Sequence, residues 1–131
     1  MTSKVETFTP ANTMTPIGPY SHIARVGQFI TIGGTAGVDP QTGELAGPDV
    51  GSQTKQILDA FETMLSAAGS DLDHIIHINI FLADMQDFAS MNAAYEAKMG
   101  ARRPARTAVA VTGLPKPGAL LTMNLTAVTK A

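Results

Sequence analysis

The sequence predicts an α+β fold in which two helices cover one face of a sheet. Two segments repeat apolar residues at the three- and four-residue spacing of amphipathic helices. Four other segments are short, apolar and rich in the β-branched residues that strands favour. Along the chain they follow the order strand, helix, strand, helix, strands. With 131 residues, the chain has the usual size of one domain, so we expect a single domain over residues 1–131.

The first predicted strand and helix are separated by a loop. "VGQFITIGG", Val26–Gly34, ends in a glycine pair, which favours a strand that stops at a turn. "VDPQTGEL" then predicts a loop. The helix is predicted over Ser52–Ala68, with Gly69 as its C-terminal stop. Its apolar stripe consists of Ile57, Phe61, Met64, Leu65 and Ala68.

The segment "HIIHINIFLA", which begins at His74, alternates as a mostly buried strand does. One predicted face carries Ile76, Ile78, Ile80 and Leu82, and the other carries Ile75, His77, Asn79 and Phe81. His74 and His77 are three residues apart in this strand, so they point to opposite faces and do not form a metal pair. We therefore expect no metal site.

A second helix follows, and then two more strands. Asp84 and Asp87 are its candidate caps, and Gly100 and Pro104 end it. Its apolar stripe consists of Phe88, Met91, Tyr95 and Met99. The next strand, Arg106–Thr112, has Val109 and Val111 on one face and Arg106, Ala108 and Ala110 on the other. "GLPKPG" separates it from the last strand, Leu120–Thr129.

Two helices on one face leave the other face of the sheet uncovered. That face is not especially polar in the predicted alternation, and only 15% of the residues are charged, against about one quarter in typical soluble proteins. Packing against the sheet of another subunit would cover it. We therefore expect an oligomer.

Composition and charge exclude several classes of function. The net charge of −2 provides no positive field for nucleic acid or acidic lipid. The chain has no cysteine, which excludes disulfides, thiolate nucleophiles and cysteine metal sites. The N-terminal "MTSKVETFTPAN" has no long apolar core, and no apolar run is long enough to span a bilayer. We expect a soluble, cytoplasmic protein.

Three of the four arginines lie within five residues, in "RRPARTAVAV". Arg102 and Arg103 are predicted to be ordinary loop charge, whose surface ion pairs contribute little. Arg106 begins a strand on the face of two alanines, and all 11 acidic residues lie at or before Glu96. It either pairs with a distant surface carboxylate or binds the carboxylate of a ligand, to which a guanidinium presents two parallel N–H donors.

Four motifs occur in order: "IGPYS" from Ile17, "DFASMNAAY" from Asp87, "PARTAV" from Pro104 and "LP" at 114 and 115. In these motifs the chain resembles the Rid/YjgF family of reactive-intermediate deaminases, from about Ile17 to Val128. The resemblance implies a chorismate-mutase-like subunit with a mixed sheet of about six strands, and a homotrimer with three sites in the clefts between subunits. It also implies hydrolysis at a C–N bond without a cofactor. Imines and enamines such as the 2-aminoacrylate/2-iminopropionate pair would give 2-oxo acids and ammonia.

The resemblance assigns roles to five residues. Arg106 matches the arginine that binds the substrate carboxylate, and Tyr20 matches a tyrosine that lines the site. Asn92 matches an asparagine of the cleft, although within a helix it can instead cap or bridge locally. Gly33 stands where many members have serine, and Ala108 stands where cysteine is frequent and the backbone matters more than the side chain.

The last strand departs from the family pattern. The first glutamate of an "EIEA"-like stretch, which activates the attacking water, aligns with Thr122, and the next acidic residue aligns with Asn124. Neither side chain accepts a proton near neutral pH, although Thr122 can hydrogen-bond a water. His22 is the nearest alternative base in the sequence. The other interpretation is that His22 has no catalytic role and is either hydrogen-bonded within the protein or exposed to solvent.

Three functions follow as hypotheses. The first is a deaminase for small imine or enamine carboxylates, with an altered substrate such as an aminomuconate-like acid as a related version. The second is a non-catalytic trimer that binds carboxylates, which the missing glutamate favours. The third is an endoribonuclease or translation inhibitor. Three features argue against it: the acidic net charge, the absence of tryptophan and the lack of a basic stripe beyond residues 98–106.

Overall fold

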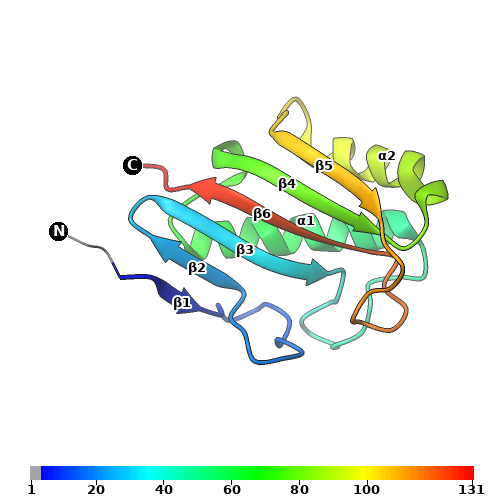
Figure 1. Cartoon of the computed structure of the whole chain (residues 1–131), viewed down its shortest axis with the longest axis horizontal. Helices are drawn as coiled ribbons and strands as arrows, with labels where there is room; N and C mark the ends of the chain where they lie inside the picture. Colours follow the sequence, from blue (N-terminus) through cyan, green and yellow to red (C-terminus); the bar gives the residue numbers. More distant parts are fainter. Residues whose placement is uncertain (1–3) are drawn as a thin grey trace.

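The computed structural model describes residues 4–131 and shows two helices packed on one face of a six-stranded mixed sheet (Figure 1), which confirms the predicted fold class. The strand order is β1-β2-β3-β6-β4-β5, and all neighbours are antiparallel except β4 and β5. The parallel pair is joined through α2, as a parallel crossover requires. The elements are β1 Glu6–Phe8, β2 Ile23–Val26, β3 Phe29–Ala36, α1 Val50–Ala67, β4 Ile75–Leu82, α2 Phe88–Met99, β5 Ala105–Ala110 and β6 Leu121–Val128, with short 3₁₀ turns η1 Leu72–His74 and η2 Met85–Asp87.

The hydrophobic core lies between the sheet and the two helices. Every second residue of β6, from Leu121 to Ala127, is buried there, as are Ile78, Ile80 and Leu82 of β4. Helix α1 contributes Ile57, Leu58, Phe61, Met64 and Leu65, all of them fully buried. Burial of this apolar surface is the main force that holds α1 and α2 to one face.

The strand predicted at Val26–Gly34 is displaced in the structure. Gly27 has a φ of +58°, a backbone conformation that favours glycine, and it lies in the turn between β2 and β3. The glycine pair does not end β3, which continues to Ala36. Instead the pairing with β6 shifts between Ile32 and Thr35, so the two glycines form a bulge inside the strand.

A second irregularity corrects the face assigned to Ile76. The pairing of β4 with β6 shifts between Ile75 and His77. As a result Ile75 is buried while Ile76 is 45% exposed, the reverse of the predicted alternation at that end. The alternation holds from His77 onward. His74 precedes β4, at the end of η1, where its Nδ1 pairs with Asp71 Oδ1 at 2.5 Å.

Helix α1 begins and ends close to the predicted residues. The Asp49 carboxylate accepts a hydrogen bond from the Ser52 N–H at 2.9 Å and caps the N-terminus. Gly69 follows the C-terminus with a φ of +82°, as the predicted stop requires.

Helix α2 confirms its predicted stripe, but neither predicted cap bonds to α2 itself. Asp84 caps the preceding turn η2 by accepting from the Gln86 N–H at 2.9 Å. Asp87 occupies the N-cap position of α2 but makes no side-chain capping bond, so its prediction as a cap was wrong. Its backbone is helical there, and an N-cap side chain reaches the first turn from an extended backbone. Gly100 ends the helix with a φ of +64°.

The sheet face that the helices leave uncovered is uncharged. On β2 to β6 the described side chains of this face are Ala, Val, Ile, Phe, Thr, Asn and His, with no Asp, Glu, Lys or Arg. His77 and Asn79 lie on it as predicted, and their polar groups are paired: Asn79 donates to Asn124 at 2.9 Å, and His77 Nε2 contacts Thr107 Oγ1 at 3.0 Å. Phe29, at its edge, is 65% exposed. Depletion of charge is typical of the centre of a protein interface.

The residue after β3 is packed directly against α1. A methyl group on Gly37 would lie 2.6 Å from the carbonyl oxygen and 2.8 Å from the Cα of Gln53. Because both atoms belong to the backbone, Gly37→Ala must separate β3 from α1, and we expect the free energy of unfolding to fall by about 2–3 kcal/mol. Urea denaturation measures this. Gly113→Ala, whose methyl meets nothing within 4 Å, is the control, and equal effects of the two changes would contradict the prediction.

Candidate functional site

Arg106 lies on β5, the edge strand, with its side chain on the side of α2. It pairs with Ile78 of β4 and therefore shares the helix-covered face. Its guanidinium carbon lies 4.9 Å from the centre of the Tyr95 ring and 5.7 Å from that of the Phe88 ring. Phe88 and Tyr95 are seven residues apart on α2 and so occupy the same stripe. Contacts with these two rings hold the half-buried cation in place.

The side chain of Arg106 makes no ion pair and no hydrogen bond with any residue between 4 and 131. The two neighbouring arginines differ from it. Arg102 pairs with Asp73 at 2.7 Å, as predicted for ordinary loop charge. Arg103 pairs with Glu96 at 3.3 Å, but both residues line the pocket around Arg106, so Arg103 is more than ordinary loop charge. The guanidinium of Arg106 is thus available to an anion from outside the subunit.

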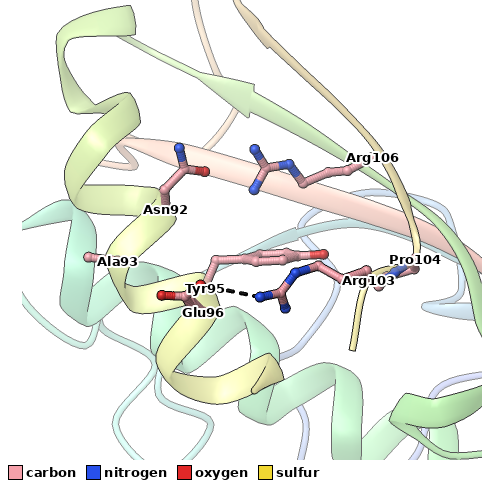
Figure 2. Close-up of a pocket in the computed structure, with 7 residues that line it drawn as sticks. All are labelled: Asn92, Ala93, Tyr95, Glu96, Arg103, Pro104 and Arg106. Atoms are coloured by element: carbon pink, nitrogen blue, oxygen red, sulfur yellow. Dashed lines mark hydrogen bonds and ion pairs between the residues drawn. The ribbon is translucent and has the colours of Figure 1, made fainter. Parts of the chain in front are cut away.

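A pocket of about 430 Å³ surrounds Arg106, between α2 and the beginning of β5. Figure 2 shows Arg106 and Asn92 extending toward one another from its opposite walls, with the Tyr95 ring beside them. Asn92 Oδ1 and the Tyr95 hydroxyl are buried and have no hydrogen-bond partner among the described residues. Buried polar atoms without partners are rare in folded proteins and call for an explanation. The Tyr95 hydroxyl, the Asn92 Nδ2 and the Arg106 guanidinium can donate hydrogen bonds to a carboxylate, whereas Asn92 Oδ1 can only accept one, from an N–H or O–H of a ligand.

The charge state of Tyr95 suits such a role. Burial raises the pKa of the Tyr95 phenol above its ordinary value, and the positive charges of Arg106 and Arg103 oppose that rise. The phenol therefore stays protonated near neutral pH and can donate a hydrogen bond. The sequence pattern predicts for Tyr95 only a place in the apolar stripe of its helix. Its hydroxyl on an otherwise apolar stripe was the available signal, because a buried tyrosine usually needs a partner.

Loss of the Tyr95 ring should weaken carboxylate binding by Arg106. We expect Tyr95→Leu to reduce the affinity for pyruvate about fivefold, the equivalent of about 1 kcal/mol for a partly buried cation–π contact. Tyr95→Phe keeps the ring but removes the O–H donor, so it should recover the part of the affinity that stacking contributes and not the part that the hydroxyl contributes. Titration calorimetry measures both variants, with urea denaturation to compare their stabilities. Equal losses of affinity in the Tyr95→Phe and Tyr95→Leu variants would show that the hydroxyl, and not stacking of the ring on Arg106, is responsible.

Tyr20, Gly33 and Thr122 lie around a second cavity of about 570 Å³. Thr122 is on the uncovered face, paired with Phe81 of β4 and Ala36 of β3. Gly33 N–H donates to the backbone oxygen of His22 at 3.0 Å, which holds the bulge of β3 beside this cavity. The Tyr20 hydroxyl accepts from the Ile17 N–H at 3.3 Å and shapes the cavity's N-terminal wall.

His22, the alternative base, is only 1% exposed and does not line this cavity. Its Nε2 lies 2.5 Å from the backbone oxygen of Met14, and its Nδ1 is buried without a partner in the described chain. This arrangement is that of a structural histidine. Ala108 shares the face of Arg106 but packs against the core and does not line the Arg106 pocket.

The structure thus groups the predicted site residues into two sets. Arg106 and Asn92 share the pocket on the helix-covered side, and Tyr20, Gly33 and Thr122 share the cavity on the uncovered side. The sheet separates the two sets within one subunit. In the part of the chain that is described, no cluster of three or more His, Cys, Asp or Glu side chains can hold a metal ion. No helix there is both long enough and apolar enough to cross a membrane.

Comparison with known proteins gives consistent matches over most of the chain. The family model described as endoribonuclease L-PSP matches residues 10–129. A RutC family protein of Pyrococcus horikoshii is 44% identical over 105 residues, which is 80% of this chain and 83% of that protein. The human 2-iminobutanoate/2-iminopropanoate deaminase is 38% identical over 100 residues, which is 76% of this chain and 73% of the human one.

Solved structures match the fold closely. The yjgF gene product of Escherichia coli superposes with a TM-score of 0.87 at 36% identity, covering 94% of this chain and 98% of that one. E. coli TdcF, crystallised with bound serine, superposes with a TM-score of 0.86 at 30% identity, covering 95% of this chain and 99% of that one.

Proposed function

The chain belongs to the Rid/YjgF family, and from this premise we propose that it is a deaminase that hydrolyses small imine or enamine carboxylates to 2-oxo acids and ammonia. The observation that carries the proposal is the Arg106 pocket. A half-buried guanidinium with no internal partner lies beside two unpartnered polar atoms, of Asn92 and Tyr95. The likeness to deaminases named for 2-imino acids supports the same substrate class.

The proposed reaction adds water across a C=N bond. Arg106 holds the substrate carboxylate by two N–H donors, which orients the adjacent imine carbon. An enamine first takes a proton at its β-carbon to become the imine. Water then adds to the imine carbon, a proton passes to nitrogen, and the tetrahedral intermediate expels ammonia to leave the 2-oxo acid.

Thr122 takes part by orienting water rather than by removing its proton. Its hydroxyl can accept a hydrogen bond from water or donate one to it but is no base near neutral pH. Imines hydrolyse readily in water, so holding substrate and water together accelerates the reaction without a carboxylate, at a lower rate than with one. Tyr20 and Gly33 form the wall beside Thr122, and Ala108 contributes through its backbone.

We place the complete site between two copies of the chain, in a homotrimer with three such sites. Arg106 and Thr122 lie on opposite sides of the sheet, so one subunit does not join them in one cavity. The uncharged uncovered face, with Phe29 and Val109 exposed, is suited to an interface. The proposal therefore assigns the Arg106 pocket to one subunit and the Thr122 cavity to its neighbour.

The test generates 2-iminopropanoate in situ with a pyridoxal-phosphate-dependent lyase and follows the appearance of pyruvate and ammonia. We expect the protein to accelerate their release over buffer. Analytical ultracentrifugation of the same sample establishes the oligomeric state. No acceleration by a correctly assembled trimer would reject the deaminase.

The second candidate is a non-catalytic protein that binds carboxylates, and the threonine at position 122 favours it. Calorimetry with a panel of 2-oxo acids distinguishes the two. Binding that Arg106→Ala abolishes, together with no turnover of any imine, would support binding alone.

A further inference from the structure

Lys116 is a half-buried cation that the proposed reaction leaves without a role. It lies in the turn before β6 and lines the 570 Å³ cavity together with Thr122 and Tyr20. No carboxylate within residues 4–131 forms an ion pair with it. Among the described residues that line the cavity it is the one charged side chain, and the rest of the wall is largely apolar, with Ile17 and Pro115 on it.

The turn that carries Lys116 is held in place by a buried side chain of α1. Gln53 is fully buried, and its Nε2 donates to the Gly118 carbonyl at 3.3 Å while its Oε1 accepts from the Leu120 N–H at 2.8 Å. Prolines 115 and 117 flank Lys116 and restrict its backbone further. A fixed backbone lowers the entropy lost when the side chain binds a ligand.

We propose that Lys116 binds a second acidic group of the substrate, so that the preferred substrates are imines or enamines of 2-oxo dicarboxylic acids. The inference rests on the proposed deaminase function and adds to it the substrate class. An ammonium group beside an apolar wall and without a counterion attracts an anion more strongly than one in water does. With Arg106 of a neighbouring copy on the first carboxylate, Lys116 would hold the distal one.

Two further features of the cavity agree with a substrate larger than three carbons. Cavities of about 300–1,000 Å³ accommodate drug-sized ligands, so the 570 Å³ on one subunit, before a neighbouring copy covers part of it, has room for more than three carbons. In addition, the cavity has Thr122 where the family pattern has a glutamate. A carboxylate there would repel a distal carboxylate and pair with Lys116, whereas a threonine does neither.

The test compares two five-carbon ligands that differ only in the distal group, 2-oxoglutarate and 2-oxopentanoate, by titration calorimetry of the assembled protein. We expect 2-oxoglutarate to bind at least tenfold more tightly. Lys116→Met should remove that preference without weakening 2-oxopentanoate, and Lys116→Arg should keep it. Lys130→Met, which removes an exposed charge outside the cavity, is the matched control and should change neither affinity.

Turnover of the two corresponding imines, produced in situ by amino-acid oxidases, separates this inference from the proposed function. Turnover of both imines with equal KM, or a preference that survives in Lys116→Met, overturns the role of Lys116 and leaves the deaminase intact. A Lys116-dependent preference in binding without turnover of either imine rejects the deaminase and supports the anion subsite. Failure of both oxo acids to bind overturns both.

Discussion

Arg106→Ala is expected to lower kcat/KM for 2-iminopropanoate about 10²- to 10³-fold. Removing a positive charge that pairs with a carboxylate in a partly desolvated site costs about 3–4 kcal/mol, which corresponds to that factor. Since the carboxylate is held in both the ground state and the transition state, the larger part of the loss should be in KM. Steady-state kinetics with the coupled lyase assay measures both constants.

Two variants make this result specific to Arg106. Arg102→Ala removes an equal charge from an ion pair with Asp73 that does not line the pocket, and it should leave both constants unchanged within about twofold. Arg106→Lys keeps the charge but loses the two parallel N–H donors, so it should recover only part of the activity. Wild-type kinetics in the Arg106→Ala variant would show that Arg106 does not bind the substrate.

Thr122→Glu is expected to raise kcat for 2-iminopropanoate about 10²-fold. The substitution supplies the carboxylate that the family pattern has at this position, and a positioned general base contributes about 10²- to 10⁴-fold. We expect a gain at the low end of this range because the residues around position 122 are not arranged to position a carboxylate. The gained activity should decline as the pH falls through the pKa of the new carboxyl group, because only the ionised form accepts a proton.

Thr122→Gln is the matched control for the rise in kcat, because glutamine has the size of glutamate but no basic oxygen at neutral pH. Equal rates in the Glu and Gln variants would show that the carboxylate does not act as a base. The Glu variant should also bind 2-oxoglutarate more weakly than wild type, because its carboxylate would pair with Lys116 and repel the distal carboxylate of the ligand. Faster turnover and weaker dicarboxylate binding are thus expected together.

Local sequence patterns predicted the elements well where the strands are regular. Both helices, β5 and β6 lie within a few residues of their predicted positions, because an apolar period reports which side of an element is buried. Errors arose at Ile76 and at the glycine pair of β3, where the pairing with β6 shifts by one residue. A bulge depends on the partner strand, so the sequence of one strand does not reveal it.

The sequence by itself determined that Arg106 has no acidic residue after it in the chain, that position 122 is a threonine, and which family the motifs indicate. Only the tertiary structure decided that Arg106 stacks on Tyr95 with no carboxylate partner, and that Lys116 shares a cavity with Thr122. It also decided that these two sets of residues lie on opposite sides of the sheet. The reason is that strand register decides to which face of the sheet a side chain points, and the connections between strands decide which residues become its neighbours. Both are set by contacts between segments far apart in sequence.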